Sequence, residues 1–263
     1  MLDAALLELQ ELTERLRRDC PWDREQTART IVPHTVEEAY EVADAALADD
    51  PQKLLDELGD LLFQVFFLAL LLEEEDEGDL EAVARAIHRK LVRRHPHVFG
   101  AAEAESAGAV RLRWEAIKSE QEGREGIFHD VPASLPALLL ARKVQRRAAA
   151  VGYDWPDLNG PFDKVHEELA EIEEALAAAG SIVPESEPDR AVAAELGDLL
   201  FTIVNVARKA NVDPELALRA TTLRFVERVE RAERIAEDAG ERWTELELDA
   251  QDRYYELAKE QLR

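Results

Sequence analysis

Two copies of one pattern occur in this chain, and they limit its possible folds more than any other feature. Residues 54–65 read LLDELGDLLFQV and residues 192–203 read VAAELGDLLFTI, so each stretch places two acids three residues apart among apolar side chains. Upstream of them, VEEAYEV at 36–42 matches HEELAEI at 166–172. The matching segments keep the same order in both halves, which indicates two tandem copies of one structural unit.

Both halves of the sequence have the period of α-helices. Apolar residues recur with helical spacing, whereas the alternation typical of strands is hard to find. Asp50-Pro51 and Asp213-Pro214 have the composition of helix starts, and Pro33 precedes another predicted helix. The sequence therefore predicts an all-α protein. The predicted helices span 2–16, 36–48, 53–74, 80–94, 108–120, 136–149, 162–179, 191–210, 214–238 and 246–261.

A segment rich in Gly, Pro and charge separates the two copies. It reads QEGREGIFHDVPASL at 121–135 and lies between two predicted helices. Because Gly and Pro interrupt helical patterns, the domain boundary is expected in this segment. We predict an N-terminal module at 1–125 and a C-terminal module at 126–263. Trp22 and Trp155 lie in matching segments of the two modules and are predicted to be core anchors.

The charge of the chain restricts its partners. Asp and Glu number 57 against 32 Lys and Arg, which gives a formal net charge of −25. This excess opposes binding to nucleic-acid polymers and to anionic membranes. A nucleotide would need a local cluster of basic side chains or bridging cations.

The sequence gives no sign of secretion or of a membrane span. The longest apolar run, LLFQVFFLALLL at 61–72, is too short to cross a bilayer. The N-terminal stretch MLDAALLELQELTERL reads as an acidic amphipathic helix rather than as a signal peptide. Cys20 is the only cysteine and forms no intramolecular disulfide. We expect a cytoplasmic protein.

Each module carries two acidic pairs on consecutive predicted helices. Residues three apart on a helix share one face, so both members of a pair project together. If the two helices pack antiparallel, four carboxylates converge, and protons or cations must then offset their repulsion and their loss of hydration. Oxygen ligands with no nearby cysteine favour Mg²⁺, or Mn²⁺, over zinc. The predicted metal ligands are Glu38, Glu41, Glu57 and Asp60 in the N-terminal module, and Glu168, Glu171, Glu195 and Asp198 in the C-terminal module.

Other interpretations of the acids are weaker. A di-iron bundle needs Glu-x-x-His on two helices, and the chain has no such sequence. A lone Glu-x-x-Glu in so acidic a chain is usually a solvated helix face, but the recurrence of the whole set within apolar helices argues against that interpretation. Gly59 and Gly197 stand between the acids, at a cost of about 1 kcal/mol relative to alanine. Each glycine indicates either that a backbone or a ligand approaches closely at this point, or simply that helix packing requires a small residue there.

The same acids carry a resemblance to a known family. EEAYE with DELGD, and EELAE with AELGD, resemble the Glu-Glu-x-x-Glu and Glu-x-x-Asp signature of the MazG nucleoside triphosphate pyrophosphohydrolases. CPWDREQT, RRHPHVF, RWEAIK and GYDW are similar to further segments of the two-module bacterial members, so the resemblance covers nearly the whole chain. It implies two tandem all-α helical-bundle modules in an intertwined homodimer. It also implies hydrolysis of nucleoside and deoxynucleoside triphosphates to monophosphate and pyrophosphate, which would clear nucleotide pools.

In this hypothesis, carboxylates and the metal supply most of the chemistry. Phosphoryl displacement depends mainly on positioning and charge neutralisation, which Mg²⁺ held by carboxylates provides. Glu167 or one of the four C-terminal acids would orient the attacking water, and the residues do not identify which. The resemblance implies substrate contacts from basic and aromatic residues, although Arg224 and Tyr255 replace the Lys and Trp usual in the family. These predicted contacts are Lys164, Arg224, Arg228, Tyr255, Lys259 and Lys118.

The C-terminal module is the favoured catalytic module. Lys164 lies one helical turn before Glu168, whereas His34 and Thr35 stand at the corresponding place in the N-terminal module. The resemblance also implies catalysis by the C-terminal module. Two alternatives stay open: a non-catalytic nucleotide-sensing or partner-binding scaffold, and a narrow dUTP or damaged-nucleotide pyrophosphatase. Base preference, sugar preference and any regulatory protein partner do not follow from the sequence.

Overall fold

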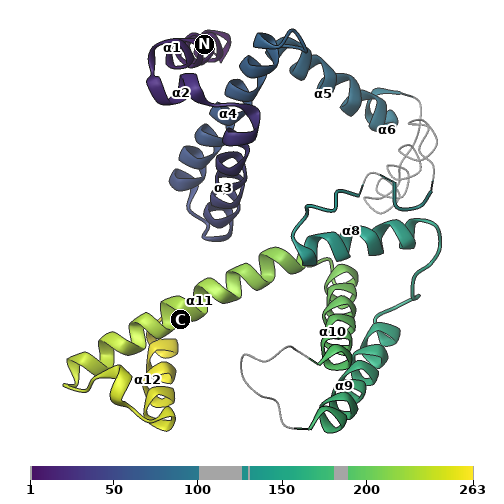
Figure 1. Ribbon diagram of the computed structural model, residues 1–263, viewed down its shortest axis with the longest axis vertical. Helices are drawn as coiled ribbons and strands as arrows, with labels where there is room; N and C mark the ends of the chain where they lie inside the picture. Colours follow the sequence, from purple (N-terminus) through teal and green to yellow (C-terminus); the bar gives the residue numbers. More distant parts are fainter. Residues whose placement is uncertain (1, 101–125, 130, 181–188, 263) are drawn as a thin grey trace. The chain divides into compact units, whose positions relative to one another are not determined.

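The computed structural model describes residues 2–100, 126–129, 131–180 and 189–262 (Figure 1). These residues form α-helices and one short 3₁₀ helix but no strand, which confirms the predicted all-α class. No described helix is both long and apolar enough to span a membrane. The chain divides into two compact units, Met1–Ile117 and Lys118–Arg263. The module boundary expected after residue 125 stays a prediction.

A helical hairpin forms the centre of the first unit. α3 (Ala28–Leu47) and α4 (Pro51–Glu74) pack along each other and are joined by a short turn. Ile31, Phe67 and Leu71 form the buried core between them, and burying such side chains contributes roughly 1.5–3 kcal/mol each. α1 packs on α4, and α5 leads from α4 to α6. The bounds of these helices are Leu2–Asp19 for α1, Pro21–Glu25 for α2, Leu80–Arg94 for α5 and Pro96–Phe99 for α6.

Aspartate and proline set two helix starts as predicted. The Asp50 carboxylate accepts hydrogen bonds from two backbone N–H groups in the first turn of α4, where Pro51 stands. Asp213 caps α11 (Pro214–Asp238) in the same way. These N–H groups have no partner inside the helix, so each cap stabilises its helix by about 1 kcal/mol.

The predictions for Pro33 and Trp22 were wrong. Thr27 and Thr30 form a capping box that starts α3 early, which leaves Pro33 inside the helix rather than before it. The side chain of Trp22 is 52% exposed, with its ring edge against His34, so it is no core anchor. The helix predicted at 108–120 lies outside the described residues.

The second unit repeats the hairpin and adds further helices around it. α9 (Asn159–Ala179) packs along α10 (Arg190–Lys209), and α8 (Ala137–Ala150) packs against α10. α11 leads away from these three helices, and α12 (Leu248–Gln261) packs against α11 after the 3₁₀ helix Trp243–Glu245 (Figure 1). The acidic hairpin and the α11–α12 pair are thus separate parts of this unit.

Candidate metal and nucleotide site

The α9–α10 hairpin brings three of its predicted metal ligands together. Glu168, Glu195 and Asp198 each place a carboxylate oxygen within 4.8 Å of the others. The spacing of three along α10 puts Glu195 and Asp198 on one face, and α9 supplies Glu168 from the neighbouring helix. Glu168 is 3% exposed, whereas Glu195 is half-buried and Asp198 is exposed. The cluster therefore has one buried acid at its base and opens towards solvent.

Lys164 lies within this acidic cluster. Its Nζ is 2.7 Å from Glu168, 2.8 Å from Glu167 and 3.9 Å from Glu171. Hydrogen bonds to Glu167 and Glu168 raise the pKa of Lys164, so this amine stays charged. Burial raises the pKa of Glu171, and the charges of Glu168 and Glu195 add to this rise against the opposing charge of Lys164. Lys164 thus offsets part of the repulsion among the acids.

One oxygen of the buried acid has no partner among the residues that the structure describes. Oε1 of Glu168 pairs with Lys164, whereas Oε2 is buried and accepts no hydrogen bond. A buried carboxylate oxygen without a partner loses its hydration and gains nothing in return. A hard divalent cation bound by Glu168, Glu195 and Asp198 would satisfy it, because such cations prefer carboxylate oxygens. The residues present therefore fit a divalent metal ion.

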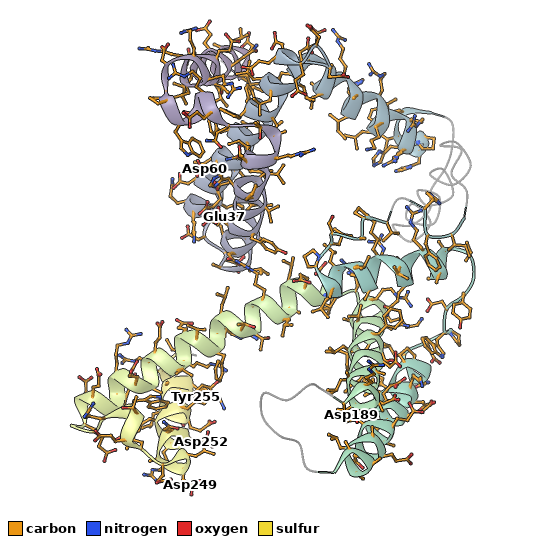
Figure 2. All side chains as sticks on the ribbon, viewed as in Figure 1. Glu37, Asp60, Asp189, Asp249, Asp252 and Tyr255 are labelled. Carbon is orange, nitrogen blue, oxygen red and sulfur yellow. The ribbon has the colours of Figure 1, made fainter. Side chains whose placement is uncertain are left out.

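The α3–α4 hairpin of the first unit assembles a similar cluster. Glu38, Glu41 and Glu57 place carboxylate oxygens within 4.8 Å of one another, and Asp60 stands on the same hairpin (Figure 2). Burial raises the pKa of Glu38, and the charges of Asp60 and Glu41 raise it further. Burial and the charge of Glu41 likewise raise the pKa of Glu57. In each unit three predicted ligands form the tight group, and the fourth, Asp60 here and Glu171 in the second unit, lies beside it.

In the described part of the chain, no lysine holds the place in the first cluster that Lys164 holds in the second. His34 Nδ1 lies 3.2 Å from Glu37, and Thr35 Oγ1 donates a hydrogen bond to Gln64 over 3.4 Å. Lys53 lowers the pKa of Glu57, but burial and the neighbouring acids outweigh it. The two clusters share their acids and differ in the cation that accompanies them.

A cavity of about 730 Å³ opens beside the second cluster. Its volume lies in the range usual for small-molecule sites. Lys164 and Glu168 line it together with Gln145 of α8 and Asn205 of α10. Neither Gln145 nor Asn205 was predicted as a site residue. For Asn205 the available signal was its place in an otherwise apolar helical stretch, FTIVNVARK at 201–209.

Trp155 forms part of the cavity wall, which corrects its prediction as a core anchor. Its side chain is 40% exposed, and Lys209 Nζ donates to its carbonyl oxygen over 2.6 Å. Arg208 pairs with Asp154 through two hydrogen bonds of 2.5 and 3.1 Å. A Cβ atom at Gly160 would lie 2.1 Å from Trp155 Cδ1, so only glycine leaves room for the ring. These contacts fasten the segment before α9 to α10.

The predicted substrate contacts of the α11–α12 pair form a separate group. Arg224 and Arg228 lie on α11, and Tyr255 and Lys259 lie on α12, where Figure 2 labels Tyr255. Lys259 Nζ is 5.9 Å from the ring centre of Tyr255. Within the described part of the chain, no hydrogen bond or ion pair joins these four residues to the acids of α9 and α10. Lys118 lies outside the described residues.

Comparison with known proteins identifies the family of the chain. The family profile described as MazG nucleotide pyrophosphohydrolase domain matches residues 26–99. The nucleoside triphosphate pyrophosphohydrolase of Escherichia coli strain K12 is 41% identical to the chain over 95% of each protein. The nucleoside triphosphate pyrophosphohydrolase/pyrophosphatase MazG of Thermotoga maritima is 39% identical over 98% of each. A nucleoside triphosphate pyrophosphohydrolase of Mycobacterium tuberculosis is 30% identical over 87% of this chain and 58% of its own length. The chain belongs to the MazG family of nucleoside triphosphate pyrophosphohydrolases.

Proposed function

We propose that the second unit hydrolyses nucleoside and deoxynucleoside triphosphates between the α and β phosphates, with Mg²⁺ or Mn²⁺ as the metal. The products are a nucleoside monophosphate and pyrophosphate. One observation carries this proposal. The buried Oε2 atom of Glu168 has no hydrogen-bond partner among the described residues, and the carboxylates of Glu195 and Asp198 lie next to it. A divalent cation and a triphosphate together match both the acids and the neighbouring cavity.

The residues of the cluster divide the tasks of this reaction among them. Glu168, Glu195 and Asp198 hold the metal, with Glu171 beside them. Bound Mg²⁺ would neutralise phosphate charge and acidify the attacking water. Lys164 carries a positive charge at the edge of the cavity and donates to a phosphate oxygen. Glu167 or one of the metal-holding acids takes the proton of the attacking water.

Two differences between the units favour the second as the catalytic one. Lys164 accompanies the second cluster, and His34 and Thr35 stand at the corresponding place in the first. The cavity of about 730 Å³ adjoins the second cluster. In this proposal the first unit binds a metal through Glu38, Glu41 and Glu57 and serves assembly or substrate contact.

The proposal includes a homodimer. Apolar side chains that would normally be buried are exposed along α10 and α11, among them Leu200 at 57% and Phe225 at 57%. Exposed apolar side chains in this number on two helices are consistent with a contact with another chain. Among the described residues, nothing outside the local helix lies within 4 Å of a Cβ built at Gly59 or Gly197, so both glycines leave room for a second copy. Such a copy would also bring the α11–α12 basic group to the acids.

A product assay tests the proposed reaction. Purified protein with Mg²⁺ is incubated with a panel of NTPs and dNTPs, and the products are resolved by ion-exchange chromatography. We expect monophosphate and pyrophosphate from the wild type, and a loss of about 100-fold or more in Glu195→Gln, which removes a metal ligand. The matched first-unit variant Glu57→Gln should retain turnover, and EDTA should abolish it in both active proteins.

The same assay separates the competing functions. Saturable, metal-dependent nucleotide binding without turnover would replace the proposed enzyme by a sensing scaffold. Turnover restricted to dUTP or to a damaged nucleotide would replace it by a narrow pyrophosphatase. A loss of activity in Glu57→Gln as large as that in Glu195→Gln would contradict the assignment of catalysis to the second unit.

A further inference from the structure

Gln145 presents a hydrogen-bond acceptor that no group in the described part of the chain uses. It lies on α8, is 6% exposed and lines the cavity beside the acids. Its Nε2 donates to the carbonyl oxygen of Phe201 over 2.7 Å, and this contact fixes which end of the amide carries the oxygen. Oε1 is buried and has no partner. Leaving a buried acceptor unpaired costs free energy, so a ligand N–H is its natural partner.

Asn205 presents the complementary group. It is 7% exposed and lines the same cavity from α10. Its Oδ1 accepts two hydrogen bonds from Arg208, of 3.1 Å from Nε and 2.6 Å from Nη2. The carbonyl end is therefore occupied, and the amide nitrogen is the end that remains for a ligand acceptor. The cavity thus offers one acceptor, on Gln145, and one donor, on Asn205.

The remaining wall suits a flat ring. Trp155 and Phe201 contribute aromatic surface to the cavity, and Phe128 adds a third ring. Aromatic side chains stack favourably on the flat faces of nucleobases. The contacts of Arg208 with Asp154 hold the Trp155 segment in place, so this wall is formed before any ligand binds.

The first unit has an apolar residue at the position that corresponds to Asn205. In the alignment of DELGDLLF with AELGDLLF, Phe67 occupies the position of Asn205. Phe67 is 1% exposed and packs with Ile31 and Leu71 in the core. The first unit has therefore kept its acids but filled this position with a core side chain. The polar residue at this position, Asn205, therefore occurs in the unit in which Lys164 accompanies the acids.

We propose that this cavity holds the nucleobase of the triphosphate, with Gln145 Oε1 accepting a base N–H and Asn205 Nδ2 donating to a base acceptor. The inference rests on the proposed function for the position of the triphosphate, because Lys164, Glu168 and Asp198 line the same cavity. A donor beside an acceptor occurs on the hydrogen-bonding edge of adenine, cytosine, guanine and uracil alike. The site therefore binds any base that has a donor next to an acceptor. Its preference among bases depends on how well each base fits the cavity.

Paired substrates test this contact directly. ATP is compared with purine riboside triphosphate, and CTP with 2-pyrimidinone riboside triphosphate, because each second member lacks only the exocyclic amino group. In the wild type we expect kcat/KM to favour the amino-bearing member of at least one pair by about 5- to 100-fold, the value of one buried hydrogen bond. In Gln145→Met that ratio should fall to about threefold or less. The same substitution at a buried glutamine of the first unit, Gln64→Met, should leave the ratio at its wild-type value.

A second variant guards against a general loss of folding. Asn205→Asp keeps an oxygen for Arg208 and exchanges the donor for an acceptor, so kcat/KM for ATP should fall about tenfold or more. Inorganic triphosphate, which has no base, should compete with wild-type affinity in both cavity variants. Equal use of both members of each pair by the wild type, or an unchanged ratio in Gln145→Met, would overturn the proposal.

Binding measurements separate this inference from the proposed reaction. Calorimetry with the uncleavable α,β-methylene analogues of ATP and purine riboside triphosphate reports base recognition without hydrolysis. Discrimination in binding with no turnover of any triphosphate would retain the base site and remove the proposed reaction. Turnover with no discrimination between the members of either pair would retain the proposed reaction and remove the base site.

Discussion

Lys164 Nζ lies 2.7 Å from Oε1 of Glu168, one helical turn further along α9. Glu168 is 3% exposed, so its carboxylate has little contact with water. The lysine is the charged partner of the most buried acid of the cluster. Because it uses only one carboxylate oxygen, the other stays available to the metal.

Replacing Lys164 with methionine should weaken both substrate and metal binding. We expect kcat/KM for ATP to fall about tenfold or more, since a charged donor to phosphate is lost. Mg²⁺ affinity should fall as well, because the buried Glu168 carboxylate loses the partner that holds it in place beside Glu195 and Asp198. Lys164→Arg keeps the charge and should retain most of the Mg²⁺ affinity. Titration calorimetry with Mg²⁺ checks this, and wild-type affinity in Lys164→Met would refute the role of the ion pair.

The acids of the first unit predict a pH dependence of stability in metal-free protein. Folding raises the pKa of Glu38 above its usual value of 4.5, chiefly through burial, so the folded protein holds this proton more tightly than the unfolded chain. This contribution to stability is complete below about pH 4.5 and is lost as the pH rises through the raised pKa. Glu38→Gln removes the ionisation. The variant should therefore be more stable than the wild type at about pH 7 and equally stable at about pH 4.

Urea denaturation in EDTA across this pH range measures the effect. Asp56→Asn is the matched control, because Asp56 is exposed on α4 and its replacement changes the net charge by the same amount. If the control raised stability at neutral pH as much as Glu38→Gln does, general charge repulsion rather than the cluster would be the cause.

Gly160→Ala should disturb the cavity wall without disturbing the metal site. The added Cβ would lie 2.1 Å from Trp155 Cδ1, which forces the ring to move. We expect kcat/KM for ATP to fall about tenfold while Mg²⁺ affinity stays at the wild-type value, because the acids lie on other parts of α9 and α10. Trp155→Phe makes room for the new methyl group. The double variant should therefore recover part of the loss, and strictly additive losses would show that the clash with Trp155 is not the cause.

The features that followed from the sequence are those set by local periodicity. The spacing of three between Glu195 and Asp198 is enough to put both on one helix face, and Asp213-Pro214 is enough to start α11. Gln145 could not be predicted in the same way. Its role depends on the contact of α8 with the Phe201 carbonyl of α10, and α8 carries no pattern that identifies this neighbour.

Long-range packing also decided where the predicted substrate contacts lie. The sequence places Arg228 and Tyr255 on helices, but helical periodicity does not state which helices meet. In the structure α11 and α12 pack against each other rather than around the acids. The same limit explains Trp155, whose apolar ring lies at a cavity wall because Lys209 and Arg208 fasten its segment to α10.

If a second copy completes the site, two inactive variants should restore activity when mixed. Glu195→Gln removes an acid from the α9–α10 hairpin, and Arg228→Gln removes a cation from the α11–α12 pair. In a mixed dimer, one site would combine intact acids from one chain with intact basic residues from the other. After denaturation and joint refolding, about a quarter of the wild-type activity should return, because half of the dimers are mixed and each has one complete site. Each variant refolded alone should stay inactive, and no recovery in the mixture would show that acids and basic residues act within one chain.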